Sequence, residues 1–237
     1  KNMNKISFFT DMEHVRKVSK KIIFQNSGGK YNLCYLKNKR IRKINDIDLV
    51  FLVLHGYGCE DGTLSAYFDL LNIPYIGSSV LASALNQNKW KMKAFLAYHD
   101  IPIVPYVGFY DEDMYTKETP ILELCEKLTY PLIVKPANLG SSIGITICKN
   151  RTELLNGIYL AIQYDSEIIV EKMIEDVMEL NCSLLGGNTY YEVSAIERVF
   201  QMDEILSYRD KYLRGSKKSV KGMAGASREI PAQITPE

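Results

Sequence analysis

A short apolar run at residues 48–54, DLVFLVL, constrains the fold more than any other feature of this sequence. A continuous run of this length, rich in Val and Leu, is typical of a strand that is buried on both faces of a parallel sheet. Residues 63–71 place apolar side chains at helical spacing, and residues 73–76 have the composition of a second strand. Strand, helix and strand in this order predict a βαβ unit, and therefore an α/β fold class.

The rest of the chain continues with short segments of both kinds. Its patterns predict helices at residues 11–23, 79–98, 121–128 and 152–164, and strands at 31–37, 101–109, 130–135, 168–173 and 180–185. Two prolines in the strand at 101–109 favour a position at the edge of its sheet. Residues 140–148 predict a Gly/Ser turn that leads into a further strand.

Composition excludes several classes of function. The chain has 237 residues, 46% of them hydrophobic, which suffices for one large domain or two small ones. Its 29 Lys and Arg nearly balance 28 Asp and Glu, which argues against a dedicated nucleic-acid-binding protein. No apolar run approaches the roughly 20 residues of a membrane-spanning helix. We expect no signal peptide, and the scattered cysteines favour a reducing cytoplasmic location over disulfides or a zinc site.

The strongest chemical signal lies at residues 130–147, YPLIVKPANLGSSIGITI. Lys135 ends an apolar strand and would supply a fixed positive charge beside the Gly/Ser loop at 140–144. Such a loop offers backbone N–H groups and hydroxyls, and can fold closely over a polyphosphate. It is not a Walker A motif, because the GxxxxGK[ST] spacing is absent. The alternative interpretation is a plain β-hairpin with an exposed lysine.

Two carboxylates mark the next segment, residues 168–180. Glu171 interrupts an apolar strand, which is unfavourable unless the carboxylate has a partner. A carboxylate here could accept hydrogen bonds from a ribose or an adenine amino group. The alternative is a solvent-facing position on an edge strand.

Two further segments carry groups that could bind a ligand. Residues 54–62, LHGYGCEDG, place His55 in a glycine-spaced loop after the first apolar strand, where open α/β sheets bind ligands. A structural histidine is the alternative. Residues 209–228 contain seven Lys or Arg and one acidic residue, Asp210. This basic segment could be a lid over phosphates, a nucleic-acid patch or a solvated linker.

Taken together, these segments resemble the D-alanine–D-alanine ligase family, whose members are ATP-grasp enzymes. The matching blocks occur in the family's order: LHGYGCEDGTLSAYFDLLNIPYIGSSVLASALNQNK, YPLIVKPANLGSSIGITI, EIIVEKMI, YRDKYL and GASREIPAQI. The resemblance extends from about residue 46 to the end of the chain, whereas the first forty residues match poorly.

The resemblance implies an ATP-dependent ligase of peptidoglycan precursor synthesis. ATP would phosphorylate the carboxylate of one D-alanine, and the amine of a second D-alanine would attack the acyl phosphate. This family uses Mg²⁺ to neutralise phosphate charge, and such chemistry depends on positioning and charge neutralisation. The resemblance also implies a homodimer, without nucleic-acid or membrane partners.

The fold implied by the resemblance combines α/β and α+β parts. We expect a Rossmann-like N-terminal domain at residues 1–77 and a central nucleotide-clamp domain at 78–178. The start of a C-terminal ATP-grasp domain, with a mobile loop, would follow at 179–237.

The resemblance also implies a nucleotide site. Its matched positions are Lys89 and Lys135 for the phosphates, Ser141, Ser142 and Gly144 for the loop above them, Glu171 with the backbone of Lys172 and Ile174 for the adenine, and Glu179 for the ribose.

The matched catalytic positions are His55 near the first D-alanine, Ser141 in a substrate hydrogen-bond network, Lys211 reaching phosphate and Tyr212 bonding to the loop serine. D-Ala–D-lactate ligases lack this tyrosine, so Tyr212 favours an amine nucleophile. The middle of the chain also looks like the D-Ala–D-Ser ligases, and that alternative stays open.

The sequence departs from the family pattern in several places. Cys59 replaces a usual glycine, Asn88 replaces a usual aspartate, and the stretch at residues 175–178 is one residue longer than usual. The family's glycine-rich opening segment is not found before Asp11. Its magnesium ligands would lie beyond Glu237, so we expect no metal ligand in this chain. A non-catalytic nucleotide-binding fragment is therefore a further possibility.

Overall fold

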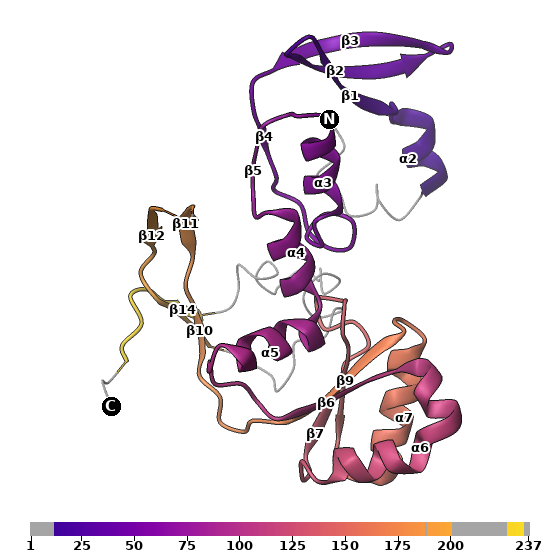
Figure 1. Cartoon of the computed structure of the whole chain (residues 1–237), viewed down its shortest axis with the longest axis vertical. Coiled ribbons are helices and arrows are strands. Elements are labelled where there is room, and N and C mark those ends of the chain that lie inside the picture. Colours follow the sequence, from indigo (N-terminus) through magenta and orange to yellow (C-terminus); the bar gives the residue numbers. More distant parts are fainter. Residues whose placement is uncertain (1–11, 188, 201–226, 235–237) are drawn as a thin grey trace, which may run out of the picture. The chain divides into compact units, whose positions relative to one another are not determined.

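The computed structural model describes residues 12–187, 189–200 and 227–234 (Figure 1). The chain forms two compact units, Lys1–Leu85 and Asn86–Glu237, and both contain helices and strands. The division at residues 77 and 178 that the resemblance implies stays a prediction. Within the described ranges, no helix combines the length and the apolar character needed to cross a membrane.

The first unit contains an antiparallel sheet of three strands in the order β1-β2-β3. Its strands are β1 (Ile22–Ser27), β2 (Lys30–Lys37) and β3 (Arg40–Ile47), and helix α2 (Met12–Val18) precedes them. Gly28 and Gly29 have φ values of 61° and 83°, as a two-residue hairpin turn between β1 and β2 requires. The helix predicted at 11–23 is therefore too long, because the helix ends at Val18 and the last predicted residues, Ile22 and Ile23, belong to strand β1 of the hairpin.

The predicted βαβ unit is confirmed in the first unit. Strand β4 (Val50–Phe51) pairs in parallel with β5 (Tyr75–Ile76), and helix α3 (Thr63–Leu70) connects them. The prediction that the first strand is buried is wrong, since Phe51 is 69% exposed. Among the described residues β4 pairs with β5 alone, so the sheet is too narrow to bury both faces of the apolar run.

The helix predicted at residues 79–98 is two helices, α4 (Val80–Gln87) and α5 (Lys89–Tyr98). Asn88 interrupts the helical pattern with an extended backbone, φ −86° and ψ 104°. Its side-chain oxygen accepts a hydrogen bond from the Lys91 backbone N–H at 2.9 Å, which makes Asn88 the N-cap of α5. Asparagine is among the preferred N-cap residues, and apolar periodicity alone does not reveal such a break.

The second unit is built on a four-stranded antiparallel sheet in the order β6-β9-β7-β8. Its strands are β6 (Tyr106–Tyr110), β7 (Leu132–Pro136), β8 (Thr146–Cys148) and β9 (Glu167–Lys172). Strand β6 lies at an edge, as predicted, but it begins only after both prolines of the strand predicted at 101–109, and β7 and β8 form the predicted hairpin. Strand β9 lies between β6 and β7.

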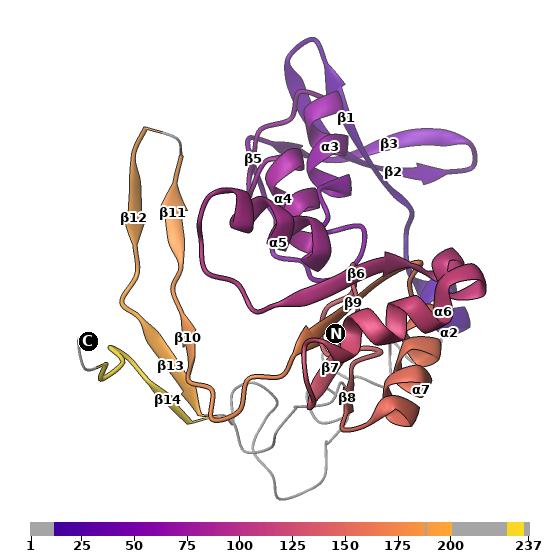
Figure 2. The same cartoon turned by 60° about the horizontal axis from the view of Figure 1, so that its bottom comes forward.

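Helices α6 (Asp111–Glu126) and α7 (Arg151–Ile162) lie side by side on one face of this sheet (Figure 2). Together with that face they enclose the main hydrophobic core, which includes Leu132, Val134, Leu154, Ile158, Ile168 and Val170. Helix α6 begins well before the predicted residue 121. A kink at Lys117 separates its first turns from a segment that continues through Pro120, and a proline is tolerated in the first turn after such a break.

Helix α5 packs on the opposite face of the same sheet. Strand side chains alternate between faces, so Ile168 and Val170 enter the core while Ile169 and Glu171 point toward α5. A Cβ atom added to Gly108 of β6 would lie 2.4 Å from the Trp90 ring of α5. A side chain at this position would have to displace the Trp90 ring, so the packing of this ring against β6 favours glycine.

The end of the second unit consists of short antiparallel strands. Strand β10 (Glu179–Asn181) pairs with β13 (Glu197–Phe200), which also pairs with β14 (Ser227–Glu229). Strands β11 (Leu184–Gly186) and β12 (Tyr191–Val193) form a hairpin beyond them. The single strand predicted at 180–185 is thus divided. Two residues separate β10 from β11 but three separate β12 from β13, so the pairing shifts by one residue, as at a β-bulge.

Candidate functional site

A cluster of charged side chains lies on the sheet face that α5 covers. Glu171 of β9 is at its centre, and its carboxylate pairs with the ammonium groups of Lys135 from β7 and Lys93 from α5. The Lys93 Nζ to Glu171 Oε1 distance is 2.7 Å. Glu171 is buried on a central strand, so the alternative of a solvent-facing position on an edge strand is wrong. The unfavourable interruption of the apolar strand is offset by two cationic partners.

The electrostatics of the cluster leave it positively charged. Burial by itself would raise the pKa of the Glu171 carboxyl, but the charges and hydrogen bonds of Lys135 and Lys93 outweigh burial and lower the pKa below its usual value. Glu171 is therefore ionised at neutral pH and balances only one of the two ammonium groups. The remaining positive charge makes this face suited to binding an anion.

Lys93 was not singled out by the sequence. Its ammonium group also donates to the Val104 carbonyl at 3.0 Å and lies 5.5 Å from the centre of the Tyr106 ring. The signal available in the sequence was its spacing from Lys89, four residues earlier, which places both lysines on one face of α5. That spacing becomes informative only once the strand beneath the helix is known.

Lys89 lies at the start of α5 and contacts the segment that follows β7. Its Nζ donates to the carbonyl oxygens of Pro136 and Ala137, both at 3.3 Å, and to that of Leu139. Burial and the nearby charge of Lys135 lower the pKa of Lys89 to about 8, against the opposing effects of Glu171 and Asp165. The structure therefore brings together Lys89, Lys135 and Glu171, three of the residues that the resemblance matched to ATP.

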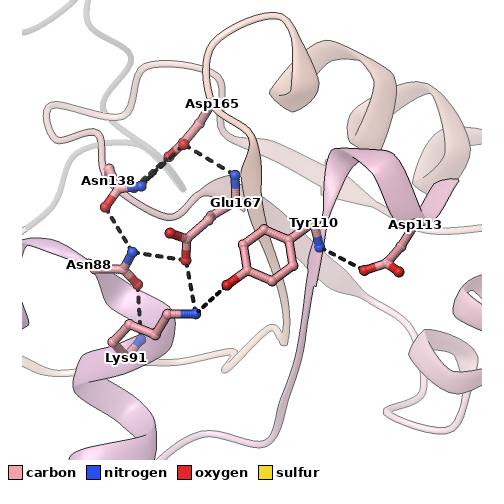
Figure 3. A network of polar contacts seen from close by, with 7 residues as sticks. All are labelled: Asn88, Lys91, Tyr110, Asp113, Asn138, Asp165 and Glu167. Atoms are coloured by element: carbon pink, nitrogen blue, oxygen red, sulfur yellow. Dashed lines mark hydrogen bonds and ion pairs between the residues drawn. The ribbon is translucent and has the colours of Figure 1, made fainter.

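A polar network fixes the base of the Gly/Ser loop (Figure 3). The Asn88 side-chain N–H₂ donates to Asn138 Oδ1 at 2.8 Å and to Glu167 Oε2 at 3.1 Å. Asn138 in turn donates from its backbone and its side chain to the Asp165 carboxylate. Lys91 completes the network with an ion pair to Glu167 at 3.1 Å. The first residues after β7 are thus tied to both α5 and β9.

Asn88 stands where the resemblance leads us to expect an aspartate, and the network shows what an asparagine does there. An aspartate has no N–H₂ group and could donate to neither Asn138 nor Glu167. Its charge would also lie beside the Glu167 carboxylate. The asparagine therefore donates to both neighbours without adding a negative charge beside Glu167, and its oxygen still caps α5.

The Gly/Ser loop itself has an unusual backbone. Ser141, Ser142 and Gly144 have φ values of 55°, 59° and 70°. A Cβ atom on Gly144 would lie 2.7 Å from the Pro136 side chain, so glycine is required there. Left-handed conformations at two serines are strained, and such strain is concentrated at functional sites. The hairpin predicted from the sequence is present. Its loop follows immediately in the sequence after Leu139, whose carbonyl accepts a hydrogen bond from Lys89.

The remaining residues matched to the nucleotide lie at and beyond the end of β9. Lys172 donates from Nζ to the Thr129 and Tyr130 carbonyls at 3.1 Å and 2.9 Å, which anchors β9 to the start of β7. Ile174 is exposed, and Glu179 pairs with Val199 in the β10–β13 ladder. Within the described ranges, the Glu179 side chain forms no hydrogen bond or ion pair with the charged cluster, and the aliphatic Ile174 side chain has no polar atom to form one.

His55 belongs to the first unit. Its side chain is 87% exposed, and its Nδ1 lies 3.4 Å from Glu60 Oε1. Asp61 accepts hydrogen bonds from the Gly58 and Thr63 backbone N–H groups at 2.7 Å and 2.9 Å, so it shapes the loop that leads into α3. The loop thus presents His55 at the surface and uses its acidic residues for local structure.

Two matched catalytic residues, Lys211 and Tyr212, lie outside the described residues, as does most of the basic segment 209–228. In the part of the chain that the structure describes, no three His, Cys, Asp or Glu side chains gather as a group that could hold a metal ion.

Two family models match the chain, the D-ala D-ala ligase N-terminus over residues 5–78 and the D-ala D-ala ligase C-terminus over residues 95–236. The D-alanine–D-alanine ligase of Natranaerobius thermophilus is 41% identical over 179 residues, covering 75% of this chain and 48% of that protein. That of Staphylococcus saprophyticus is 41% identical over 194 residues, covering 81% of this chain and 51% of that protein. The chain thus spans about half the length of the curated relatives it matches.

Solved structures agree with these relatives. The D-alanine–D-alanine ligase of Helicobacter pylori matches with a TM-score of 0.67 and 26% identity, covering 81% of this chain and 57% of that one. The D-Ala:D-Ser ligase VanG of Enterococcus faecalis matches with a TM-score of 0.69 and 29% identity, covering 94% and 61%. The predicted mixed α/β and α+β fold of the ATP-grasp type is confirmed. The chain belongs to the D-alanine–D-alanine ligase family.

Proposed function

We propose that this chain is part of an ATP-dependent ligase that joins two D-alanines through an acyl phosphate for peptidoglycan precursor synthesis. The observation that carries the proposal is the cluster of Glu171 with Lys135 and Lys93, next to Lys89 and the Gly/Ser loop. A fixed excess of positive charge at the base of a strained, glycine-containing loop suits a nucleotide polyphosphate. The names of the relatives supply the ligase activity and the D-alanine substrate.

In this proposal the described residues bind and orient ATP. Lys89 and Lys135 would contact its phosphates, and Ser141, Ser142 and Gly144 would close over them. Adenine would lie against the end of β9, near Glu171 and the backbone of Lys172 and Ile174, with the ribose at Glu179. His55, Lys211 and Tyr212 would act at the D-alanine side, as the resemblance implies.

Magnesium is part of the family's chemistry, but the described residues do not fit it. In residues 12–187, 189–200 and 227–234, no three carboxylate, imidazole or thiol side chains form a group that could hold a metal ion. A cytoplasmic location and a homodimer are further parts of the proposal that rest on the resemblance alone.

A D-Ala–D-Ser ligase is the second candidate. It is favoured by one observation, the match of VanG over 94% of this chain. The amine nucleophile would then be D-serine, and the nucleotide site would be the same. A nucleotide-binding chain without ligase activity is the remaining alternative.

Phosphate release by the purified chain with Mg-ATP tests these candidates, with D-alanine, D-serine and D-lactate compared as second substrates. Release that requires D-alanine supports the main proposal, and preference for D-serine supports the second candidate. ATP binding without release would support the non-catalytic alternative.

Calorimetric ATP binding to Lys135→Ala tests the site itself. We expect affinity to fall at least about tenfold, because the variant removes the positive charge that the proposal places beside the phosphates and leaves Glu171 with one cationic partner fewer. Lys117→Ala is a matched control, since this exposed lysine also pairs with a carboxylate, Asp113, at 2.8 Å. Equal ATP affinity of Lys135→Ala and the unmodified chain would refute the assignment of the phosphate site.

A further inference from the structure

Lys93 is a buried lysine of the charged cluster to which the proposed function assigns no contact with ATP. Its side chain is 10% exposed, whereas that of Lys135 is 23% exposed. Two polar partners, Glu171 Oε1 at 2.7 Å and the Val104 carbonyl at 3.0 Å, already accept hydrogen bonds from its ammonium group. Little of Lys93 is left for a ligand to contact. Of the two lysines on Glu171, the more accessible one is Lys135.

The number of charges shows what Lys93 adds. Glu171 contributes one negative charge, and Lys135 alone would neutralise it. With Lys93 also bound to Glu171, the three side chains carry a net charge of +1. The carboxylate has two oxygens, and each lysine binds a different one, Oε1 for Lys93 and Oε2 for Lys135. Lys93 therefore compensates Glu171 from the buried side and leaves positive charge on the accessible side.

We propose that Lys93 is a positioning residue of the nucleotide site, which holds and neutralises the Glu171 carboxylate so that the Lys135 ammonium is available to a polyphosphate. The inference rests on the proposed function, because it assumes that the anion bound beside Lys135 is the phosphate chain of a nucleotide. Lys93 acts through Glu171 and Lys135 and does not touch the anion.

A charge-rescue experiment separates this role from a purely structural one. Tripolyphosphate, which lacks the adenine and the ribose, is titrated calorimetrically into the full chain and into Lys93→Met, Lys93→Arg, Glu171→Gln and the double variant Lys93→Met/Glu171→Gln. The net charge of the three side chains is +1 in the unmodified chain, 0 in Lys93→Met, +2 in Glu171→Gln and again +1 in the double variant. Thermal unfolding of each variant is recorded in parallel.

We expect Lys93→Met to bind tripolyphosphate at least about tenfold more weakly, since one charge near a bound anion is lost at an effective dielectric constant of about 20. Lys93→Arg keeps the charge and should bind within about threefold of the unmodified chain. Glu171→Gln should bind more tightly, and the double variant should recover the affinity that Lys93→Met loses. Lys117→Met, which removes an exposed lysine of α6, should leave binding unchanged.

The order of affinities decides the outcome. A double variant that binds no better than Lys93→Met, or a Glu171→Gln variant that binds more weakly than the unmodified chain, would overturn the role of Lys93. If Lys93→Met does not fold, Glu171→Gln is compared with the double variant, which leaves no unpaired carboxylate. The double variant has one positive charge fewer and should bind more weakly, and equal affinities would overturn the role of Lys93. An unmodified chain that binds neither tripolyphosphate nor ATP would refute the proposed nucleotide site instead.

Discussion

Replacing Asn88 by the family's usual aspartate should destabilise this chain. Asn88 is 7% exposed, and its N–H₂ group donates to Asn138 Oδ1 at 2.8 Å and Glu167 Oε2 at 3.1 Å. Asn88→Asp removes both donors and places two carboxylates in contact. The N-cap hydrogen bond from Lys91 can persist, because it uses the oxygen that both side chains share.

The magnitude follows from these contacts. Two negative charges about 4 Å apart repel by about 4 kcal/mol at an effective dielectric constant of about 20. Lys91 Nζ and Asn88 Nδ2 both lie 3.1 Å from Glu167 Oε2, so the ammonium is within about 6 Å of the new carboxylate, and its attraction to that carboxylate offsets about half of the repulsion. The lost hydrogen bond to Asn138 adds about 1 kcal/mol. We therefore expect the free energy of unfolding to fall by about 3 kcal/mol, which lowers the melting temperature by about 6–12 °C.

Urea unfolding followed by circular dichroism measures this change. Burial and Glu167 raise the pKa of the new carboxyl above its unfolded value, so the penalty is complete at neutral pH and disappears as pH falls below the unfolded pKa. Asn150→Asp is the matched control, because Asn150 also caps a helix and donates to a carboxylate, Glu153, but at the surface. We expect a change below about 1 kcal/mol there. Equal stability of both variants at neutral pH would refute the reasoning.

Two further predictions concern α5. Gly108→Ala should lower the free energy of unfolding by about 2 kcal/mol or more, because its Cβ would lie 2.4 Å from the Trp90 ring. The control Gly140→Ala has nothing within 4 Å of its Cβ and should change the free energy of unfolding by less than about 1 kcal/mol. Equal effects of the two substitutions in urea titrations would contradict this packing. The folded pKa of Lys89 is about 8, below its ordinary 10.5, so the unfolded chain binds more protons between these values. The stability of the unmodified chain relative to Lys89→Met should therefore rise as pH increases from about 8 to 10.5, and a flat difference would contradict the lowered pKa.

The parts of the fold that the sequence predicted are those in which burial and local pattern agree. Strand β9 has a continuous apolar run that suits burial on both faces, helix α7 has apolar residues at helical spacing, and both contribute to the main core. The pattern failed where a single polar residue decides the structure. Asn88 divides a helix because its side chain caps α5, and apolar residues on both sides hide that break.

The candidate site shows a similar limit. Glu171 was selected from the sequence because a carboxylate within an apolar strand needs a partner, and Lys135 because it ends a strand beside the Gly/Ser loop. Neither the partner nor the face could be known, since β9 lies between β6 and β7 in the sheet although 30 residues separate the end of β7 from the start of β9 in the chain. Lys93 shows the consequence. On the helix it is one lysine among three at alternate positions, and only its contact with Glu171 distinguishes it from Lys91, whose ammonium pairs with Glu167 instead. The charge available to a nucleotide depends on that pairing, so it is a property of the tertiary structure and not of the motif.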